Sequence, residues 1–68
     1  MLTPLKHERL RLGIKQFDLA IETRILPWKL SKFETGKMEP TPKELKKLFK
    51  VIPTLKEFPG KITAGIDR

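Results

Sequence analysis

The sequence contains no cysteine, so it can form neither a disulfide nor a thiolate metal site. Because cysteine-free chains fit a reducing environment, we expect the protein to be cytoplasmic. No apolar run approaches the roughly 18 residues that a helix needs to cross a bilayer. The opening stretch MLTPLKHERL lacks the long apolar segment of a secretory signal. We therefore expect no membrane contact and a single domain, close to the lower size limit of chains that fold alone.

Acidic side chains are scarce relative to basic ones. The 68 residues include 15 lysines and arginines but only 8 aspartates and glutamates, which gives a formal net charge of +7. Such an excess favours a polyanionic partner, either nucleic acid or an acidic protein surface. The sign of the charge does not by itself distinguish these partners.

The sequence offers little for catalysis. Its one histidine, His7, precedes Glu8, and adjacent residues on a helix do not face each other. We interpret His7 as a surface residue. The sequence has no Ser-His-Asp set, no cluster of metal ligands and no glycine-rich phosphate loop. We therefore expect no enzyme, no bound metal and no cofactor.

Start and stop signals divide the chain into short helices. We expect helices at residues 4–12, 16–24, 27–34 and 41–52, with one further turn at 53–58. Thr3 is an N-cap before Pro4, and Gly13 is suited to end the first helix. Thr41 and Glu44 form a capping box for the fourth helix. Residues 59–68 are rich in proline, glycine and polar residues, so we divide the chain into a domain at 1–58 and a tail at 59–68.

Each expected helix has one apolar face. At about 100° per residue, the predicted buried positions are Leu5, Arg9, Leu12, Gln16, Leu19, Ala20, Thr23, Ile25, Leu30, Phe33, Leu45, Leu48, Phe49, Ile52, Leu55 and Phe58. Isolated helices of this length are marginal in water, so tertiary packing must hold them together. The predicted fold class is all-α, a compact bundle of four to five helices.

The third helix has an unusual outward face. Opposite its buried side lie Trp28, Ser31, Lys32 and Thr35, with Lys29 beside them and Lys37 in the following loop. A solvated face would normally mix glutamate with lysine and carry no tryptophan. Because the major groove of B-DNA, about 12 Å wide, admits one α-helix, this face predicts a helix-turn-helix. The second helix of that motif would read DNA, and lysines near it would meet phosphates.

The stretch RLRLGIKQFDLAIETRILPWKLSKFETGKMEPTPKEL resembles the Xre-like family of Cro proteins and phage repressors. The resemblance covers about residues 5–52. The shared positions are Gly13, Gln16, Leu19, Ala20, Ile25, Leu30, Ser31, Phe33, Glu34, Gly36, Pro40 and Thr41. It implies a phage-repressor-like DNA-binding domain with the third helix, residues 27–35, in the major groove.

The resemblance also implies residue roles. By its pattern, Gln16 contacts a phosphate and braces the third helix, and Arg9 and Glu34 form a partly buried ion pair. Lys29 and Ser31 are included because they lie on or beside the outward face of the third helix. The candidate DNA-binding residues are therefore Gln16, Pro27, Trp28, Lys29, Ser31, Lys32, Thr35 and Lys37. Among them, Pro27, Trp28 and Lys32 occupy base-reading places, and Thr35 and Lys37 occupy places that contact the DNA backbone.

The chain departs from the family pattern around the turn. Arg24 stands where the family has glycine, and a left-handed backbone there costs about 1 kcal/mol, so we expect a reshaped turn. Leu26 stands where Ser or Thr caps the helix, a loss of about 1 kcal/mol that Pro27 partly offsets. Pro27 and Trp28 also replace a small polar pair. Base readout should therefore depend on Lys32, Lys29 and DNA shape.

Phe17 and Ile21 form a small apolar patch on the second helix, where the family has polar residues. Something should cover this patch. The candidates are Ile62 and Ile66 of the tail, a second subunit or a different protein. We hypothesise a protein contact at Phe17 and Ile21.

We predict a sequence-specific DNA-binding transcriptional regulator of the repressor type. One module buries only roughly 600–1,000 Å² on DNA, so we expect a homodimer on double-stranded DNA, with its interface in the region after Ile52. The lysines of the fourth helix are interpreted as a solvated face. Two alternatives remain, an antitoxin-type DNA-binding protein that masks a partner protein and a small basic adaptor that contacts polymerase or RNA.

Overall fold

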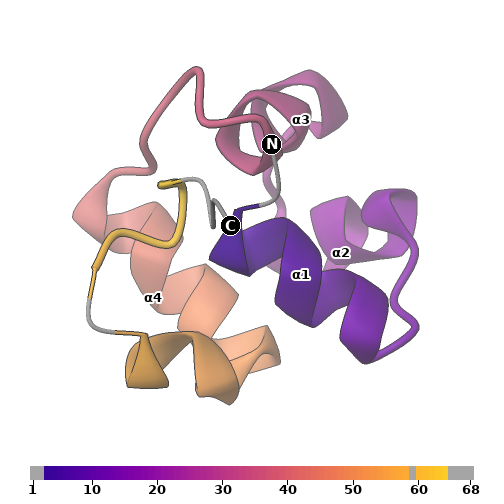
Figure 1. The fold of residues 1–68 in the computed structure, drawn as a ribbon. Coiled ribbons are helices and arrows are strands. Elements are labelled where there is room, and N and C mark those ends of the chain that lie inside the picture. Colours follow the sequence, from indigo (N-terminus) through magenta and orange to yellow (C-terminus); the bar gives the residue numbers. More distant parts are fainter. Residues whose placement is uncertain (1–2, 59, 65–68) are drawn as a thin grey trace.

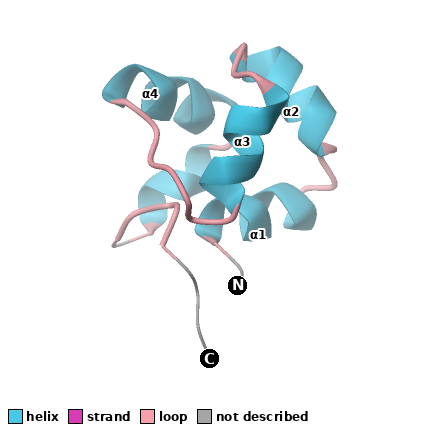
Figure 2. Cartoon of the chain, turned by 90° about the horizontal axis from the view of Figure 1, so that it is seen from above, coloured by secondary structure: helices cyan, strands magenta, loops and turns pink. Residues whose placement is uncertain are grey.

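The computed structural model describes residues 3–58 and 60–64 of the chain, and its secondary structure there is entirely helical, with no strand. The elements are α1 (Pro4–Arg11), α2 (Gln16–Thr23), α3 (Pro27–Glu34), α4 (Pro42–Val51) and the 3-10 helix η1 (Pro53–Glu57) (Figure 1). Seen from above, α3 lies in the middle of the view, between α4 and α2, and α1 runs below it (Figure 2). The all-α prediction is confirmed, and the helix bounds agree with the sequence to within one residue at most ends.

The helices enclose a single core. Its buried apolar members are Leu5, Leu19, Ala20, Ile25, Leu30, Phe33, Leu48, Ile52, Leu55 and Ile62. Leu45, Phe49 and Phe58 are only half-buried. The prediction for Leu12 was wrong, since its exposed fraction is 44%. The reason is local: α1 ends at Arg11, Leu12 is its C-cap, and Gly13 turns the chain away with a φ of 72°.

The first turn of α1 is hydrogen-bonded to Ile62 and, through Thr3, to the end of α3. A helix leaves its first N–H groups without partners inside the helix. Here Pro4 has no N–H, the Leu5 N–H donates to the Ile62 carbonyl at 3.0 Å, and the Lys6 N–H donates to the Thr3 hydroxyl at 3.2 Å. The same hydroxyl donates to the Glu34 carbonyl at 2.9 Å. Thr3 therefore caps α1 and also joins it to the end of α3.

Residues 60–64 belong to the folded unit, although the sequence indicated a tail there. Ile62 is buried in the core, and its carbonyl caps α1. Thr63 is also buried. Residues 60–64 thus pack through the Ile62 side chain and one main-chain hydrogen bond. Ile66, the other tail residue considered as a cover for Phe17 and Ile21, lies outside the described residues.

The turn between α2 and α3 keeps a left-handed residue. Arg24 has φ 58° and ψ 32°, so the turn is not reshaped as expected. The residue is held because the Ile25 N–H donates back to the Ala20 carbonyl at 3.2 Å and the Ile25 side chain is buried. Leu26 provides no side-chain cap, and Pro27 begins α3, as the sequence predicts.

Glu8 joins α1 to η1. It is buried, and its carboxylate accepts hydrogen bonds from Arg11 and, at 2.7 Å, from the Thr54 hydroxyl. The Arg11 guanidinium and the Thr54 hydroxyl lower the pKa of Glu8 to about 2, so it is ionised at neutral pH. His7 contacts the same carboxylate at 3.0 Å, which corrects the expectation that these neighbours do not meet.

Candidate nucleic-acid interface

The two sides of α3 have opposite character, as the sequence predicts. Leu30 and Phe33 are fully buried. On the other side, the exposed fraction of Trp28 is 54%, and Lys32 and Thr35 are exposed. Pro27 is exposed as well, and Ser31 is half-buried. The indole is therefore available on the surface beside a lysine.

A buried ion pair sets the position of α3 against α1. Arg9 donates to both carboxylate oxygens of Glu34, with Nη2 3.1 Å from Oε1. A third guanidinium nitrogen, Nη1, donates to the Ile14 carbonyl at 2.8 Å. The planar guanidinium can hold a carboxylate in this way with a fixed geometry. The predicted pair is confirmed, and it accounts for an arginine on the buried side of α1.

Gln16 adds a second brace to the same carboxylate. Its side-chain amide donates to Glu34 Oε1 at 3.0 Å, which links the first residue of α2 to the last residue of α3. The predicted bracing role is thus confirmed. The predicted phosphate contact of Gln16 stays a prediction.

Lys29 lies beside the outward face and forms an ion pair. Its amino group is 2.8 Å from Glu44 Oε2, so it joins α3 to the first turn of α4. Burial raises the pKa of Glu44, but the hydrogen bonds from Lys29 and Thr41 outweigh it and leave the pKa lowered. Glu44 also closes the predicted capping box with Thr41 at 2.8 Å. Since Glu44 holds its charge, Lys29 is a weaker candidate for a DNA contact than Lys32.

The end of α3 presents Thr35 and Lys37. The Thr35 hydroxyl donates to the Ser31 carbonyl at 3.0 Å, which fixes its rotamer while its oxygen still has acceptor capacity. Gly36 has a φ of 75°, and the Lys37 N–H then donates to the Lys32 carbonyl at 2.9 Å. The Lys37 side chain is exposed directly after the helix.

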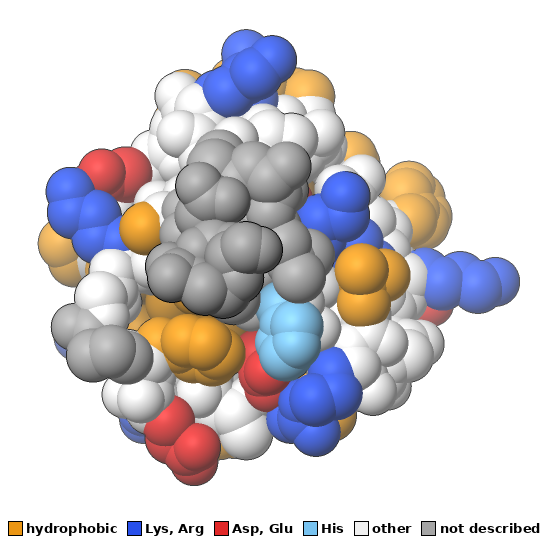
Figure 3. Space-filling model, in the orientation of Figure 1, with side chains coloured by type: hydrophobic (Ala, Val, Ile, Leu, Met, Phe, Trp, Pro, Cys, Tyr) orange, Lys and Arg blue, Asp and Glu red, His pale blue; other side chains and the backbone are white. Residues whose placement is uncertain are grey.

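Among the described residues, two of the three candidate lysines, Lys32 and Lys37, form no ion pair, whereas Lys29 pairs with Glu44. Within residues 3–58 and 60–64, the glutamates in ion pairs are Glu8, Glu34, Glu39 and Glu44. None of these pairs includes Lys32 or Lys37. On the face shown in Figure 3, basic side chains are spread around the edge, with acidic ones between them. The exposed lysines of α4 are Lys43, Lys46, Lys47 and Lys50.

The apolar patch on α2 is open to solvent. Phe17 and Ile21 are exposed to 63% and 58%, and Leu26 to 59%. Together with the buried Ala20 and Ile25 they surround a hollow of about 240 Å³. Ile62 lies in the core and does not cover them. Phe17 and Ile21 are therefore exposed, as the sequence indicated, and a protein contact there stays a prediction.

The described part of the chain has neither a cluster of metal ligands nor a membrane-spanning helix. It contains no group of three or more histidine, aspartate or glutamate side chains placed to hold a metal ion. No helix in it has both the length and the apolar character to cross a membrane.

Comparisons with known proteins do not extend this description. The chain matches no family model, no curated protein and no solved structure.

Proposed function

We propose that the protein is a sequence-specific DNA-binding transcriptional regulator, with α2 and α3 as a helix-turn-helix. The observation that supports this most is the outward face of α3, where an exposed Trp28 lies beside Lys32 while Arg9 and Glu34 fix the helix from behind. The helix would enter the major groove, with Pro27, Trp28 and Lys32 towards base edges. Thr35, Lys37 and Gln16 would contact phosphates.

The net charge of +7 supports a polyanionic partner of this kind. Phosphate contacts release counterions and provide affinity without sequence preference. Because one module buries too little surface for tight operator binding, we propose a homodimer on related half-sites. It would act in the cytoplasm, on nucleoid DNA.

Substitution of Trp28 tests base readout. Trp28→Ala should change the preference for the affected base pairs by about 1–3 kcal/mol each, because the exposed ring would lie against base edges. The preferred duplex would first be selected from a random pool. Anisotropy titrations of single-base variants of that duplex would then compare the two proteins.

The fold should survive this change, since the exposed fraction of Trp28 is 54%. Circular dichroism melting provides the check. An unfolded Trp28→Ala variant would show that the ring is structural. An equal loss of affinity for every duplex would show that the ring does not read sequence.

Substitution of Lys37 tests backbone contact. Lys37→Ala should weaken binding to all duplexes alike and reduce the slope of log K against log salt by about one, because one phosphate contact is lost. The matched control is Lys47→Ala on α4, which removes the same charge from an exposed position. If both variants change the slope equally, net charge rather than a contact at Lys37 governs binding.

A second proposal follows from the exposed patch at Phe17 and Ile21. Neighbouring exposed apolar side chains can mark a site of protein contact, and this patch fits an antitoxin-type protein that also masks a partner. Salt-dependent binding to a selected duplex, a random duplex and RNA separates the proposals. A basic adaptor would show no preferred duplex, whereas an antitoxin would prefer one and also hold a stoichiometric protein.

A further inference from the structure

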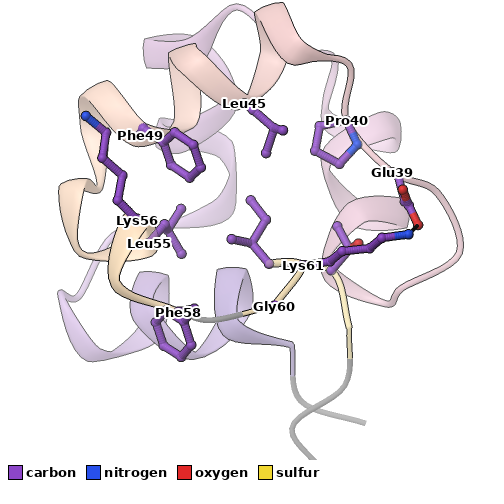
Figure 4. A pocket seen from close by; sticks show the side chains of 11 residues that line it. Glu39, Pro40, Leu45, Phe49, Leu55, Lys56, Phe58, Gly60 and Lys61 are labelled. Atoms are coloured by element: carbon purple, nitrogen blue, oxygen red, sulfur yellow. Dashed lines mark hydrogen bonds and ion pairs between the residues drawn. The ribbon is translucent and has the colours of Figure 1, made fainter.

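Two lysines beside the hollow between α4, η1 and residues 60–63 do not form a shared anion site. Figure 4 shows Lys56 and Lys61 at opposite ends of this hollow, and Lys61 is paired with Glu39, with Nζ 2.7 Å from Oε2. Lys32, by contrast, is exposed on α3 and forms no ion pair among the described residues. Its ammonium group is therefore the better candidate for a specific polar contact.

The outward face of α3 offers hydrogen-bond donors but few acceptors. The Lys32 ammonium has N–H donors and no acceptor, and the Trp28 indole only donates. Two hydroxyls could accept, but Ser31 is half-buried and Thr35 lies beyond the last residue of the helix, at its C-cap. Residues 27–34 include no asparagine, glutamine or aspartate, and the side chain of their glutamate is buried. This face therefore suits base edges that accept hydrogen bonds.

Base edges in the major groove differ in what they offer to Lys32 and Trp28. Guanine carries two acceptors there, N7 and O6, and lysine is a usual partner of both. Adenine and cytosine each present an amino donor, which needs an amide or carboxylate acceptor. Thymine presents a methyl group to apolar side chains, which suits the exposed indole ring. Trp28 precedes Lys32 by about one helical turn, so the two side chains can reach bases within about three base pairs of each other.

We propose that each half-site contains a guanine contacted by Lys32 and, within about three base pairs, a thymine whose methyl group lies against Trp28. The inference rests on the proposed function, because it assumes that α3 enters the major groove. Lys29 takes no part in it, since its amino group is 2.8 Å from Glu44 Oε2. Sequence preference would then come from one donor group and one apolar ring.

Single-atom changes in a duplex selected from a random pool test the guanine contact. Each guanine is replaced in turn by its deaza analogue, which lacks N7, and at one position the parent chain should bind about fivefold more weakly or worse. Lys32→Met, which removes the charge but keeps an unbranched side chain, should respond to that replacement by less than about twofold. Lys37→Met removes the same charge and should keep the full response, because Lys37 is proposed to contact a phosphate. Both lysines are exposed, so both variants should melt like the parent chain.

Replacing each thymine in turn by deoxyuridine, which lacks the methyl group, tests the second contact. At one position the parent chain should bind about threefold to fourfold more weakly, the effect of one buried methyl group, and Trp28→Ala should show no such loss. A selected duplex in which no guanine depends on Lys32, or no thymine methyl depends on Trp28, would overturn the inference and leave DNA binding intact. If no duplex is selected, the proposed function is wrong and the inference fails with it.

Discussion

Replacing Arg9 with alanine is expected to lower the free energy of unfolding by about 3–5 kcal/mol, because one partner of a buried ion pair is removed. The side chain of Glu34 is only 2% exposed, and without Arg9 its carboxylate would keep only the hydrogen bond from Gln16. The Ile14 carbonyl would also lose its side-chain donor. Urea denaturation at neutral pH provides the measurement. Since small domains are stable by roughly 5–15 kcal/mol, this loss would be a large fraction of the total stability.

A double variant keeps this prediction testable. Arg9→Met combined with Glu34→Leu should regain most of the lost stability, because apolar side chains of similar volume often replace a buried ion pair at no net cost. Lys47→Ala serves as the control, because this side chain is exposed and forms no ion pair among the described residues, and it should change the free energy of unfolding by no more than about 0.5 kcal/mol. A loss below 1 kcal/mol in Arg9→Ala would contradict the bracing role.

The double variant also separates stability from function. If the ion pair sets the position of α3, the refolded double variant should bind the selected duplex less well than the parent, although its stability is similar. The fork of Arg9 fixes an angle as well as a distance, whereas methionine and leucine adapt to each other.

Replacing Ile62 with alanine is expected to lower the free energy of unfolding by about 2–5 kcal/mol. Ile62 is 4% exposed and belongs to the same core cluster as Leu5, Leu48 and Leu55. The substitution leaves the main-chain hydrogen bond from Leu5 to residue 62 in place, so it isolates the contribution of the side chain. Thermal and urea denaturation of the full-length variant provide the measurement.

The neighbouring Lys61→Ala is the matched control. Its side chain is 69% exposed and pairs with an exposed Glu39, so its loss should cost at most about 1 kcal/mol. If Ile62→Ala is as stable as this control, residues 60–64 contribute no core packing. The domain boundary that the sequence indicated after residue 58 would then be the better description.

Much of the architecture is encoded by short-range signals. Thr3, Thr41 and Glu44 cap helices where the sequence predicts, and Pro4, Pro27 and Pro42 begin helices. These signals operate within one turn of helix, so they do not depend on how the chain packs. The alternation of sides on α3 also follows from its periodicity. The Arg9–Glu34 pair was predicted only through the resemblance to a family.

Contacts between distant residues account for the differences. The sequence marked Glu44 as a capping residue, and packing of α3 on α4 also made it the partner of Lys29. The position of Leu12 in the helical repeat predicts that it is buried. However, α1 ends one residue earlier, at Arg11, so the direction of the Leu12 side chain no longer follows that repeat. Arg24 keeps a left-handed backbone because burial of Ile25 compensates for its local cost.

By itself the sequence determined the all-α class, the helix bounds, the apolar side of α3 and the excess of positive charge. Each of these depends on neighbours within about one helical turn or on composition. Only the tertiary structure decided that Ile62 joins the core, that Thr3 bridges α1 and α3, and that Glu8 joins α1 to η1. These features bring together groups that are far apart in the chain, and their positions are set by close packing of all the helices at once.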